Sequence, residues 1–199
     1  MTRYKNRYRV ETIRWQNWDY SDVGQYFVTI CINKRDKILG TVDNGKMILS
    51  PYGEIVKSEI LAIHTYFDNV DVDEWVIMPN HLHLIITIYD VETIHELSLH
   101  QQQQQIHELS LQRRQQHDKQ YHIKRRQMLI PKIIGKFKMR TSKKMNEIRH
   151  TEGYKNWQSD YFDRVIRNEK EYYRIKQYIV NNPLNWYKDK LYTEKPKTQ

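Results

Sequence analysis

Two histidines one residue apart are the first candidates for chemistry in this chain. His81 and His83 lie in an apolar run, Trp75–Ile86, that is typical of a β-strand. Side chains alternate along a strand, so both imidazoles are expected on one face, where they could chelate a divalent cation. A pair of half-exposed strand histidines without a metal is the alternative. The residues expected on the opposite face are Val76, Met78, Leu82, Leu84 and Ile86.

A tyrosine and an asparagine form the second candidate pair. Tyr178 and Asn182 are four residues apart in a helix predicted over 169–182, so they share a face of that helix. A tyrosine hydroxyl can attack phosphorus and leave a phosphotyrosine if nearby groups activate it and neutralise the phosphate. The Asn182 oxygen could complete a metal site begun by two histidines. The alternative is a packing tyrosine followed by an Asn-Pro helix end.

Positive charge is concentrated in one quarter of the chain. The whole sequence has 33 Lys and Arg against 24 Asp and Glu, and residues 101–150 hold 13 of the former and 3 of the latter. Concentrated charge beside aromatic residues is typical of a nucleic-acid partner, although a solvated helix face is the other explanation. If the partner is a nucleic acid such as DNA, the residues expected to bind it are Arg7, Arg9, Lys132, Lys136, Lys138, Arg140, Lys143 and Lys144.

The elements that must position these residues alternate between strand and helix. Strands are predicted at 26–33 and at 74–89, the second broken at Pro79-Asn80, with a hairpin over 37–49. Helices are predicted to begin near Pro51, Pro131 and Glu169, with a short extended segment at 157–166. This order predicts an α+β fold with a ferredoxin-like antiparallel sheet and helices on one face. The tail from Lys188 is polar and is expected to fray.

One segment has a composition unlike the rest. Residues 94–105 and 106–117 are tandem 12-residue repeats with 8 identical positions. A solenoid needs about three units, so the repeat predicts a low-complexity insertion at about 94–120. We therefore expect one domain over residues 1–190, interrupted by this insertion, and a polar tail at 191–199.

Other features exclude whole classes of protein. No stretch approaches the roughly 18 apolar residues of a membrane span, and Cys31 is the single cysteine, so no disulfide framework can form within the chain. These features predict a reduced cytoplasmic setting, where a DNA-binding protein would associate with the nucleoid.

Several separated segments resemble the HUH single-tyrosine transposases, most of all the REP-associated tyrosine transposases. The matching segments are 7–9, 18–20, 26–31, 78–83, 133–138, 157–158, 165–169 and 178–186. The resemblance implies a ferredoxin-like fold and Mg²⁺- or Mn²⁺-dependent cleavage of single-stranded, hairpin-containing DNA, with strand transfer through a covalent 5′-phosphotyrosine. It also implies metal ligands at His81, His83 and Asn182 and a nucleophile at Tyr178.

Two other classes of function stay open. A non-cleaving DNA-hairpin-binding protein or repressor could use the same fold. A zinc-dependent hydrolase could use the histidine pair, but the chain lacks a carboxylate motif such as His-Glu-x-x-His. The partner expected for the transposase-like function and for the DNA-binding function is single-stranded or hairpin DNA. It would be bound by a monomer or homodimer away from any membrane.

Overall fold

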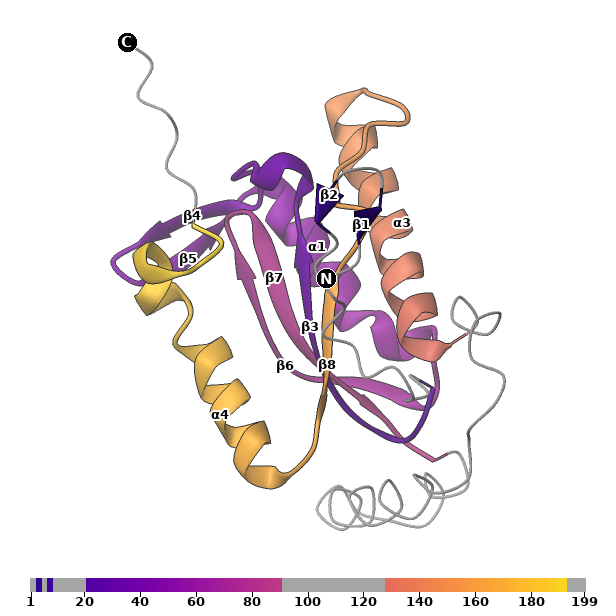
Figure 1. The fold of residues 1–199 in the computed structure, drawn as a ribbon. Helices are drawn as coiled ribbons and strands as arrows, with labels where there is room; N and C mark the ends of the chain where they lie inside the picture. The colour runs from indigo at the N-terminus through magenta and orange to yellow at the C-terminus, as the bar shows by residue number, and fades with distance from the viewer. Residues whose placement is uncertain (1–2, 5–6, 9–20, 91–127, 193–199) are drawn as a thin grey trace.

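A four-stranded antiparallel sheet forms the centre of the molecule (Figure 1). The computed structural model describes residues 3–4, 7–8, 21–90 and 128–192. The sheet has the order β6-β7-β3-β8 and consists of β3 (Gly24–Cys31), β6 (Val70–Met78), β7 (His81–Ile88) and β8 (Phe162–Ile166). Helices α1 (Pro51–Leu61) and α3 (Leu129–Arg149) make the two crossovers. The resulting strand order and helix positions confirm the predicted α+β, ferredoxin-like architecture.

Smaller elements surround this sheet. Helix α4 (Glu169–Val180) follows β8 and leads into the 3₁₀ helix η5 (Pro183–Lys188). The predicted hairpin is β4 (Gly40–Asp43) with β5 (Lys46–Leu49), joined by Asn44 and Gly45, which both have positive φ. Positive φ at both turn residues is the geometry that an Asn-Gly pair favours. The remaining elements are β1 (Arg3–Tyr4), β2 (Arg7–Tyr8), η1 (Asn33–Arg35) and η2 (Ile63–Thr65).

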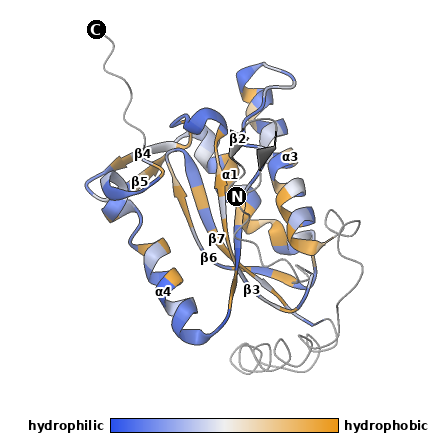
Figure 2. Cartoon of the chain, viewed as in Figure 1, coloured by the Kyte–Doolittle hydropathy of each residue, from blue (hydrophilic) through white to orange (hydrophobic). Residues whose placement is uncertain are grey.

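Both faces of the sheet are covered. Every residue of β7 is buried, which requires a packed layer on each side. Helices α1 and α3 cover one face and share a core with Leu82, Leu84 and Ile86. Figure 2 shows apolar residues on the side of α3 that faces the sheet. The sequence analysis predicted helices on one face only. This expectation is wrong, because α4 packs on the other face.

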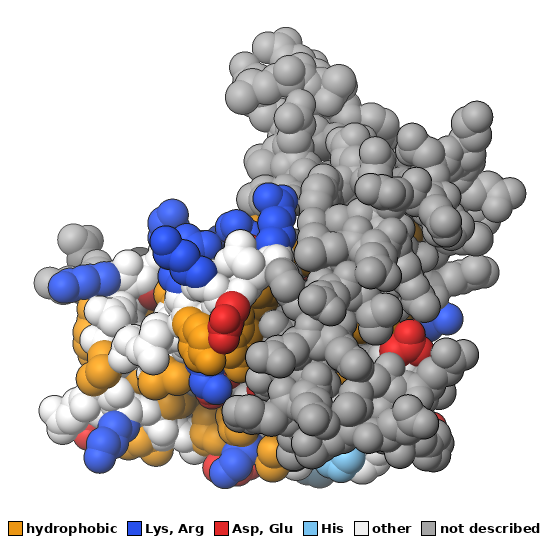
Figure 3. All heavy atoms as spheres, turned by 90° about the horizontal axis from the view of Figure 1, so that it is seen from below, with side chains coloured by type: hydrophobic (Ala, Val, Ile, Leu, Met, Phe, Trp, Pro, Cys, Tyr) orange, Lys and Arg blue, Asp and Glu red, His pale blue; other side chains and the backbone are white. Residues whose placement is uncertain are grey.

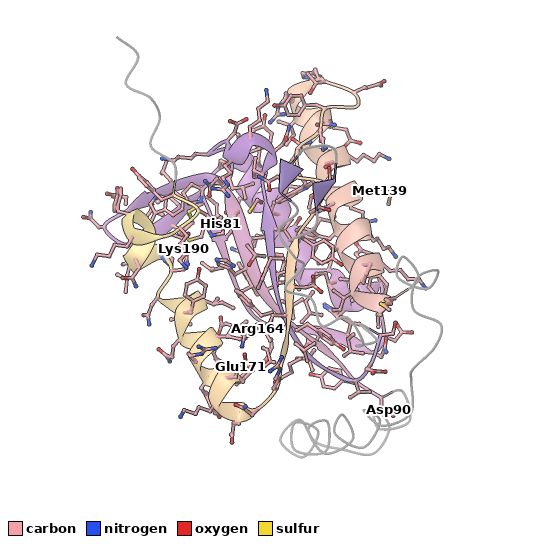
Figure 4. All side chains as sticks on the ribbon, viewed as in Figure 1. His81, Asp90, Met139, Arg164, Glu171 and Lys190 are labelled. Carbon is pink, nitrogen blue, oxygen red and sulfur yellow. The ribbon has the colours of Figure 1, made fainter. Side chains whose placement is uncertain are left out.

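The opposite layer is held by the apolar stripe of α4. Its residues Tyr172, Ile175 and Ile179 recur at helical spacing and pack with Ile85 of β7 in a second core cluster. Polar contacts fix the same helix. The Tyr172 hydroxyl donates to Asp73 of β6 at 2.8 Å, and the ion pair between Arg164 of β8 and Glu171 joins the strand to the helix (Figure 4).

A tight turn at Pro79-Asn80 decides which side chains share a face with the histidines. The turn folds β7 back on β6 so that Met78 pairs with His81 and Val76 pairs with His83. Directly paired residues of antiparallel strands lie on the same face. The prediction that Val76 and Met78 face away from the histidines is therefore wrong, because the two-residue turn resets the alternation that an unbroken strand would follow.

Two sequence predictions concern segments at the limits of the described chain. The insertion expected at 94–120 lies in 91–127, outside the described residues, as does the tail from 193. The single-domain division thus stays a prediction. The expected fraying from Lys188 does not hold as far as Tyr192, because Leu191 accepts a hydrogen bond from Asn80 at 2.8 Å and Tyr192 packs on Trp186. Among the described helices, none combines the length and apolar character that crossing a membrane requires.

Candidate active site

Strand β7 presents its two histidines to the layer formed by α4 and η5. His81 and His83 are both buried, and their Nε2 atoms lie 3.1 Å apart. The expectation that the two imidazoles share one face is confirmed. Both rings lie at the end of the sheet where β7 begins, beside the turn that contains Asn80.

Hydrogen bonds behind the imidazoles orient both rings. The Asn80 side chain donates through Nδ2 to the Leu191 carbonyl at 2.8 Å, so its Oδ1 faces His81 Nδ1, also at 2.8 Å. An acceptor at that position requires a proton on His81 Nδ1 and leaves a lone pair on Nε2 of the neutral ring. The Thr29 hydroxyl lies 2.8 Å from Nδ1 of His83 and can play the same role.

The surroundings keep both imidazoles neutral. Burial lowers the pKa of His81 to about 4, an effect that Asp189 opposes and Arg35 reinforces. Burial, and secondly the neighbouring His81, holds the pKa of His83 well below its ordinary value. Neutral imidazoles are the form that binds metals, so the protonation state suits a cation site.

Helix α4 brings Tyr178 to the same point. Its Oη lies 3.2 Å from His83 Nε2, while its ring packs 5.1 Å from the His83 ring and 6.2 Å from Phe27. The residue as a whole is 45% exposed, so part of the side chain is open to solvent. Burial of the hydroxyl, and secondly the charge of Asp189, raises the pKa of Tyr178 to about 12. The phenol is consequently protonated at neutral pH and needs a proton acceptor in order to attack.

A carboxylate that sequence reasoning missed completes the group. Asp189 follows η5, and its Oδ2 lies 4.0 Å from His81 Nε2 and 3.4 Å from the Tyr178 hydroxyl. Its other oxygen, Oδ1, accepts from the Leu191 amide at 2.6 Å. His81, His83 and Asp189 offer ligand atoms within 4.8 Å of one another. Asp189 has no diagnostic spacing from either histidine, so no sequence signal marked it.

Asn182 contacts the same carboxylate as the tyrosine does. It is buried, and its Nδ2 donates to Asp189 Oδ2 at 2.9 Å. Its Oδ1 is buried and has no hydrogen-bond partner among the described residues. An unsatisfied buried carbonyl oxygen is costly unless something binds it, and a cation is one such partner.

These donors fit a divalent cation. Two neutral imidazoles, a carboxylate and an unpaired amide oxygen are ligands that divalent transition metals accept, and the hydrogen bonds from Asn80 and Thr29 to the Nδ1 atoms orient the imidazoles. The sequence-predicted set of His81, His83 and Asn182 is thus brought together, with Asp189 added beside it.

The predicted DNA-binding residues of α3 lie away from this site, because α3 packs on the opposite face of the sheet. Three of them have internal partners. Lys138 donates to the carbonyl oxygens of residues 158–160, whereas Arg140 and Lys144 each lie 2.7 Å from the buried carboxylate of Glu59.

The other predicted DNA-binding residues are differently placed. Lys132 and Lys143 are exposed, and Lys136 Nζ lies 4.5 Å from the Tyr66 ring centroid. Arg7 is described only as part of β2, and Arg9 is outside the described residues. Arg164 of β8 and Arg174 of α4 are also exposed, and Figure 3 shows several Lys and Arg side chains on the face seen from below, so positive charge is not confined to α3.

The fold and site define a class: a ferredoxin-like α+β protein with a buried histidine pair, a carboxylate and a tyrosine hydroxyl at one end of the sheet. Over 184 residues the chain is 34% identical to an uncharacterised protein of Haemophilus influenzae, covering 92% of this chain and 93% of that one. The chain belongs to the same family as that protein. No protein-family profile matches it.

Two solved structures are similar in fold. One is a REP-associated tyrosine transposase bound to a REP hairpin, with a TM-score of 0.45 and 16% identity over 94% of this chain and 74% of that chain. The other is a candidate transposase of Deinococcus radiodurans, with a TM-score of 0.40 and 16% identity over 79% of this chain and 88% of that chain.

Proposed function

We propose that this protein is a metal-dependent endonuclease and strand transferase that acts on single-stranded, hairpin-containing DNA through a 5′-phosphotyrosine at Tyr178. The observation that carries the proposal is the position of the Tyr178 hydroxyl, 3.2 Å from His83 Nε2 and 3.4 Å from Asp189 Oδ2. A nucleophile placed against a cation-binding group is what phosphoryl transfer to tyrosine requires.

The geometry of the site supports a particular choice of ligand residues. His81 and His83 would hold the cation through Nε2, with an oxygen of Asp189 or Asn182 beside them. A bound divalent cation supplies positive charge that polarises and orients a phosphate. Asn80 and Thr29 keep the two rings in the orientation that this requires.

The tyrosine would carry the covalent step. Its Oη forms a bond to phosphorus, and the bond from phosphorus to the 3′ oxygen breaks, so the leaving strand takes up a proton and ends in a 3′-OH. The proton of the phenol needs an acceptor, and Asp189 Oδ2 is within 3.4 Å. A later 3′-OH attacks the phosphotyrosine and releases Tyr178, so strands can be exchanged without ATP.

The test is capture of the covalent intermediate. Wild-type protein is incubated with 5′- and 3′-labelled hairpin DNA and Mn²⁺, and denaturing gels are inspected for a protein–DNA adduct that carries the label of the 3′ fragment. Tyr178→Phe should lose the adduct because phenylalanine cannot form a phosphodiester. It should keep its fold because the ring is retained.

Three other tyrosines provide the controls. Tyr172 is engaged with Asp73, Tyr173 is exposed on another side of α4, and Tyr161 lies before β8. Each Tyr→Phe variant should still form the adduct. An adduct that persists in Tyr178→Phe and disappears in one of these would assign the nucleophile elsewhere. Hairpin binding without any adduct in wild type would favour the non-cleaving DNA-binding alternative.

A further inference from the structure

A line of aromatic rings runs from the histidine pair to the surface. The ring centroids of His81 and Trp186 are 6.0 Å apart, those of Trp186 and Tyr192 are 5.1 Å apart, and those of Tyr192 and Tyr187 are 5.5 Å apart. Trp186 is buried, whereas Tyr187 is 71% exposed. The inner rings are thus part of the core, and the outermost ring is available to a partner.

One lysine contacts an outer ring, and two more lie next to the rings in the sequence. Lys37, from the segment between η1 and β4, places its Nζ 4.4 Å from the Tyr192 centroid. Lys188 and Lys190 are exposed on either side of Asp189, whose own side chain is only 4% exposed. Figure 4 shows Lys190 at the same end of the molecule as His81. The charges beside the rings are thus Lys37, Lys188 and Lys190, with Asp36 as an exposed acid next to Lys37, while Asp189 between the other two lysines is turned towards the site.

The adjoining loop adds another cation. Arg35 is exposed and lies in η1, where Lys34 and Arg35 have φ values of 55° and 58°. Consecutive non-glycine residues in the left-handed region carry a conformational cost that the surrounding structure must support. Hydrogen bonds from Asn33 to Asn156 and from Leu39 to Pro79 anchor the loop on both sides. The loop is thereby held next to the Pro79-Asn80 turn and the histidines.

We propose that the surface formed by Tyr187, Tyr192, Lys37, Lys188 and Lys190, called here the aromatic–lysine surface, binds an unpaired nucleic-acid strand beside the candidate active site. This rests on the proposed function, since it assigns the path of the strand that Tyr178 would cleave. An exposed aromatic ring offers a face on which a base can stack, and lysines beside it can contact the backbone phosphates. A duplex keeps its base faces stacked internally and could use only the lysines.

This surface is separate from the basic helix predicted from sequence. Helix α3 packs on the opposite face of the sheet, and Lys138, Arg140 and Lys144 are occupied by internal partners. The aromatic–lysine surface instead continues directly from His81 through Trp186. It therefore adjoins the histidine pair, which α3 does not.

The test measures binding without cleavage. Tyr187→Ala is made in full-length protein that also carries Tyr178→Phe, and fluorescence anisotropy in chelator gives the affinity for an unpaired oligonucleotide and for a blunt duplex of equal length. Loss of one stacking contact should weaken single-strand binding by about fivefold or more and leave duplex binding nearly unchanged. Tyr187→Phe should retain single-strand affinity because the ring remains. Lys37→Ala should reduce the salt dependence of single-strand binding by about one phosphate contact.

Tyr154→Ala is the matched control, because Tyr154 is also exposed, at 44%, but lies beyond α3 with the Arg149 guanidinium 4.4 Å from its ring centroid. It should bind both oligonucleotides like the parent protein. Circular dichroism checks that each variant is folded, which is expected because Tyr187 is mostly solvent-exposed.

Two outcomes would overturn the inference. Unchanged single-strand affinity in Tyr187→Ala means that no base stacks there, and an equal loss on duplex means that the surface recognises only backbone charge. The adduct assay separates this from the proposed function. If wild type forms the adduct and Tyr187→Ala has no effect on binding, the aromatic–lysine surface is rejected and the proposed function is retained. If Tyr187→Ala weakens single-strand binding but wild type forms no adduct, the surface is retained and the proposed function is rejected.

Discussion

Tyr178 and His83 are 95 residues apart in the chain, yet the tyrosine hydroxyl lies 3.2 Å from the histidine Nε2. The contact depends on α4 lying across the face of the sheet that carries the histidines, where Ile175 and Ile179 pack with Ile85. A nucleophile on a helix and metal ligands on a strand are thus joined by apolar packing, which holds them more rigidly than a loop would.

The identity of the oxygen ligand can be tested by comparing Asp189→Asn with Asn182→Ala. A carboxylate binds a divalent cation more strongly than a neutral amide, so Asp189→Asn should weaken Mn²⁺ binding by about tenfold or more. Asn182→Ala should have the smaller effect. Isothermal titration calorimetry provides the affinities, with His81→Ala as the reference that removes a ligand outright. A larger loss in Asn182→Ala would make the asparagine the third ligand, as the family resemblance implies.

Asn80 should matter to the metal site although it offers no ligand atom to it. Its Oδ1 faces His81 Nδ1, and its Nδ2 holds the carbonyl of Leu191, two residues after Asp189. Asn80→Ala should weaken Mn²⁺ binding by about 10- to 100-fold, which is the range for losing a residue that orients a metal-binding histidine. Asn80→Asp keeps the acceptor for His81 and loses the donor to Leu191, so it should retain more affinity than Asn80→Ala. Equal affinities in wild type and Asn80→Ala would show that the ring needs no such support.

Stability should fall on acidification when no metal is bound. The pKa of His81 is lowered from 6.5 to about 4, so the unfolded chain binds the proton more readily than the folded protein does. The free energy of unfolding is therefore highest above pH 6.5 and decreases as the pH drops towards 4. The linkage relation gives a loss of about 2 kcal/mol at pH 5 from this group. Urea denaturation in chelator at pH 7.5 and pH 5 measures the difference, which should shrink in His81→Gln. An identical pH dependence in both proteins would contradict the assignment.

The repeat at 94–117 should be dispensable for folding. It lies in the connection between the end of β7 at Ile88 and the start of α3 at Leu129. Removing it leaves 16 residues to join the two elements. The free-energy cost of closing this loop then changes by under about 1 kcal/mol. We expect the deletion variant to unfold cooperatively, with a free energy of unfolding within about 1 kcal/mol of the parent. Loss of the cooperative transition would show that the repeat is part of the core.

Several features of the site could be predicted from the sequence because they are local. Alternation along a strand places His81 and His83 on one face, and four-residue spacing places Tyr178 near Asn182. The same logic was wrong for Val76 and Met78, because the Pro79-Asn80 turn folds the strand back and pairs them directly with the histidines. A periodicity holds only within one unbroken element, and a tight turn restarts it.

The sequence by itself determined the strands of the central sheet, the β4–β5 hairpin, the three α-helices, their order, and the histidine and tyrosine candidates, since these depend on spacing, capping and apolar periodicity. Only the tertiary structure decided that α4 covers the histidine face, that Asp189 joins His81, and that Arg140 and Lys144 of the basic helix pair with Glu59. Those relationships join residues with no fixed separation in the chain. They arise from the way the apolar faces close on one another, since burying β7 on both sides draws α4, η5 and the segment after them onto the sheet.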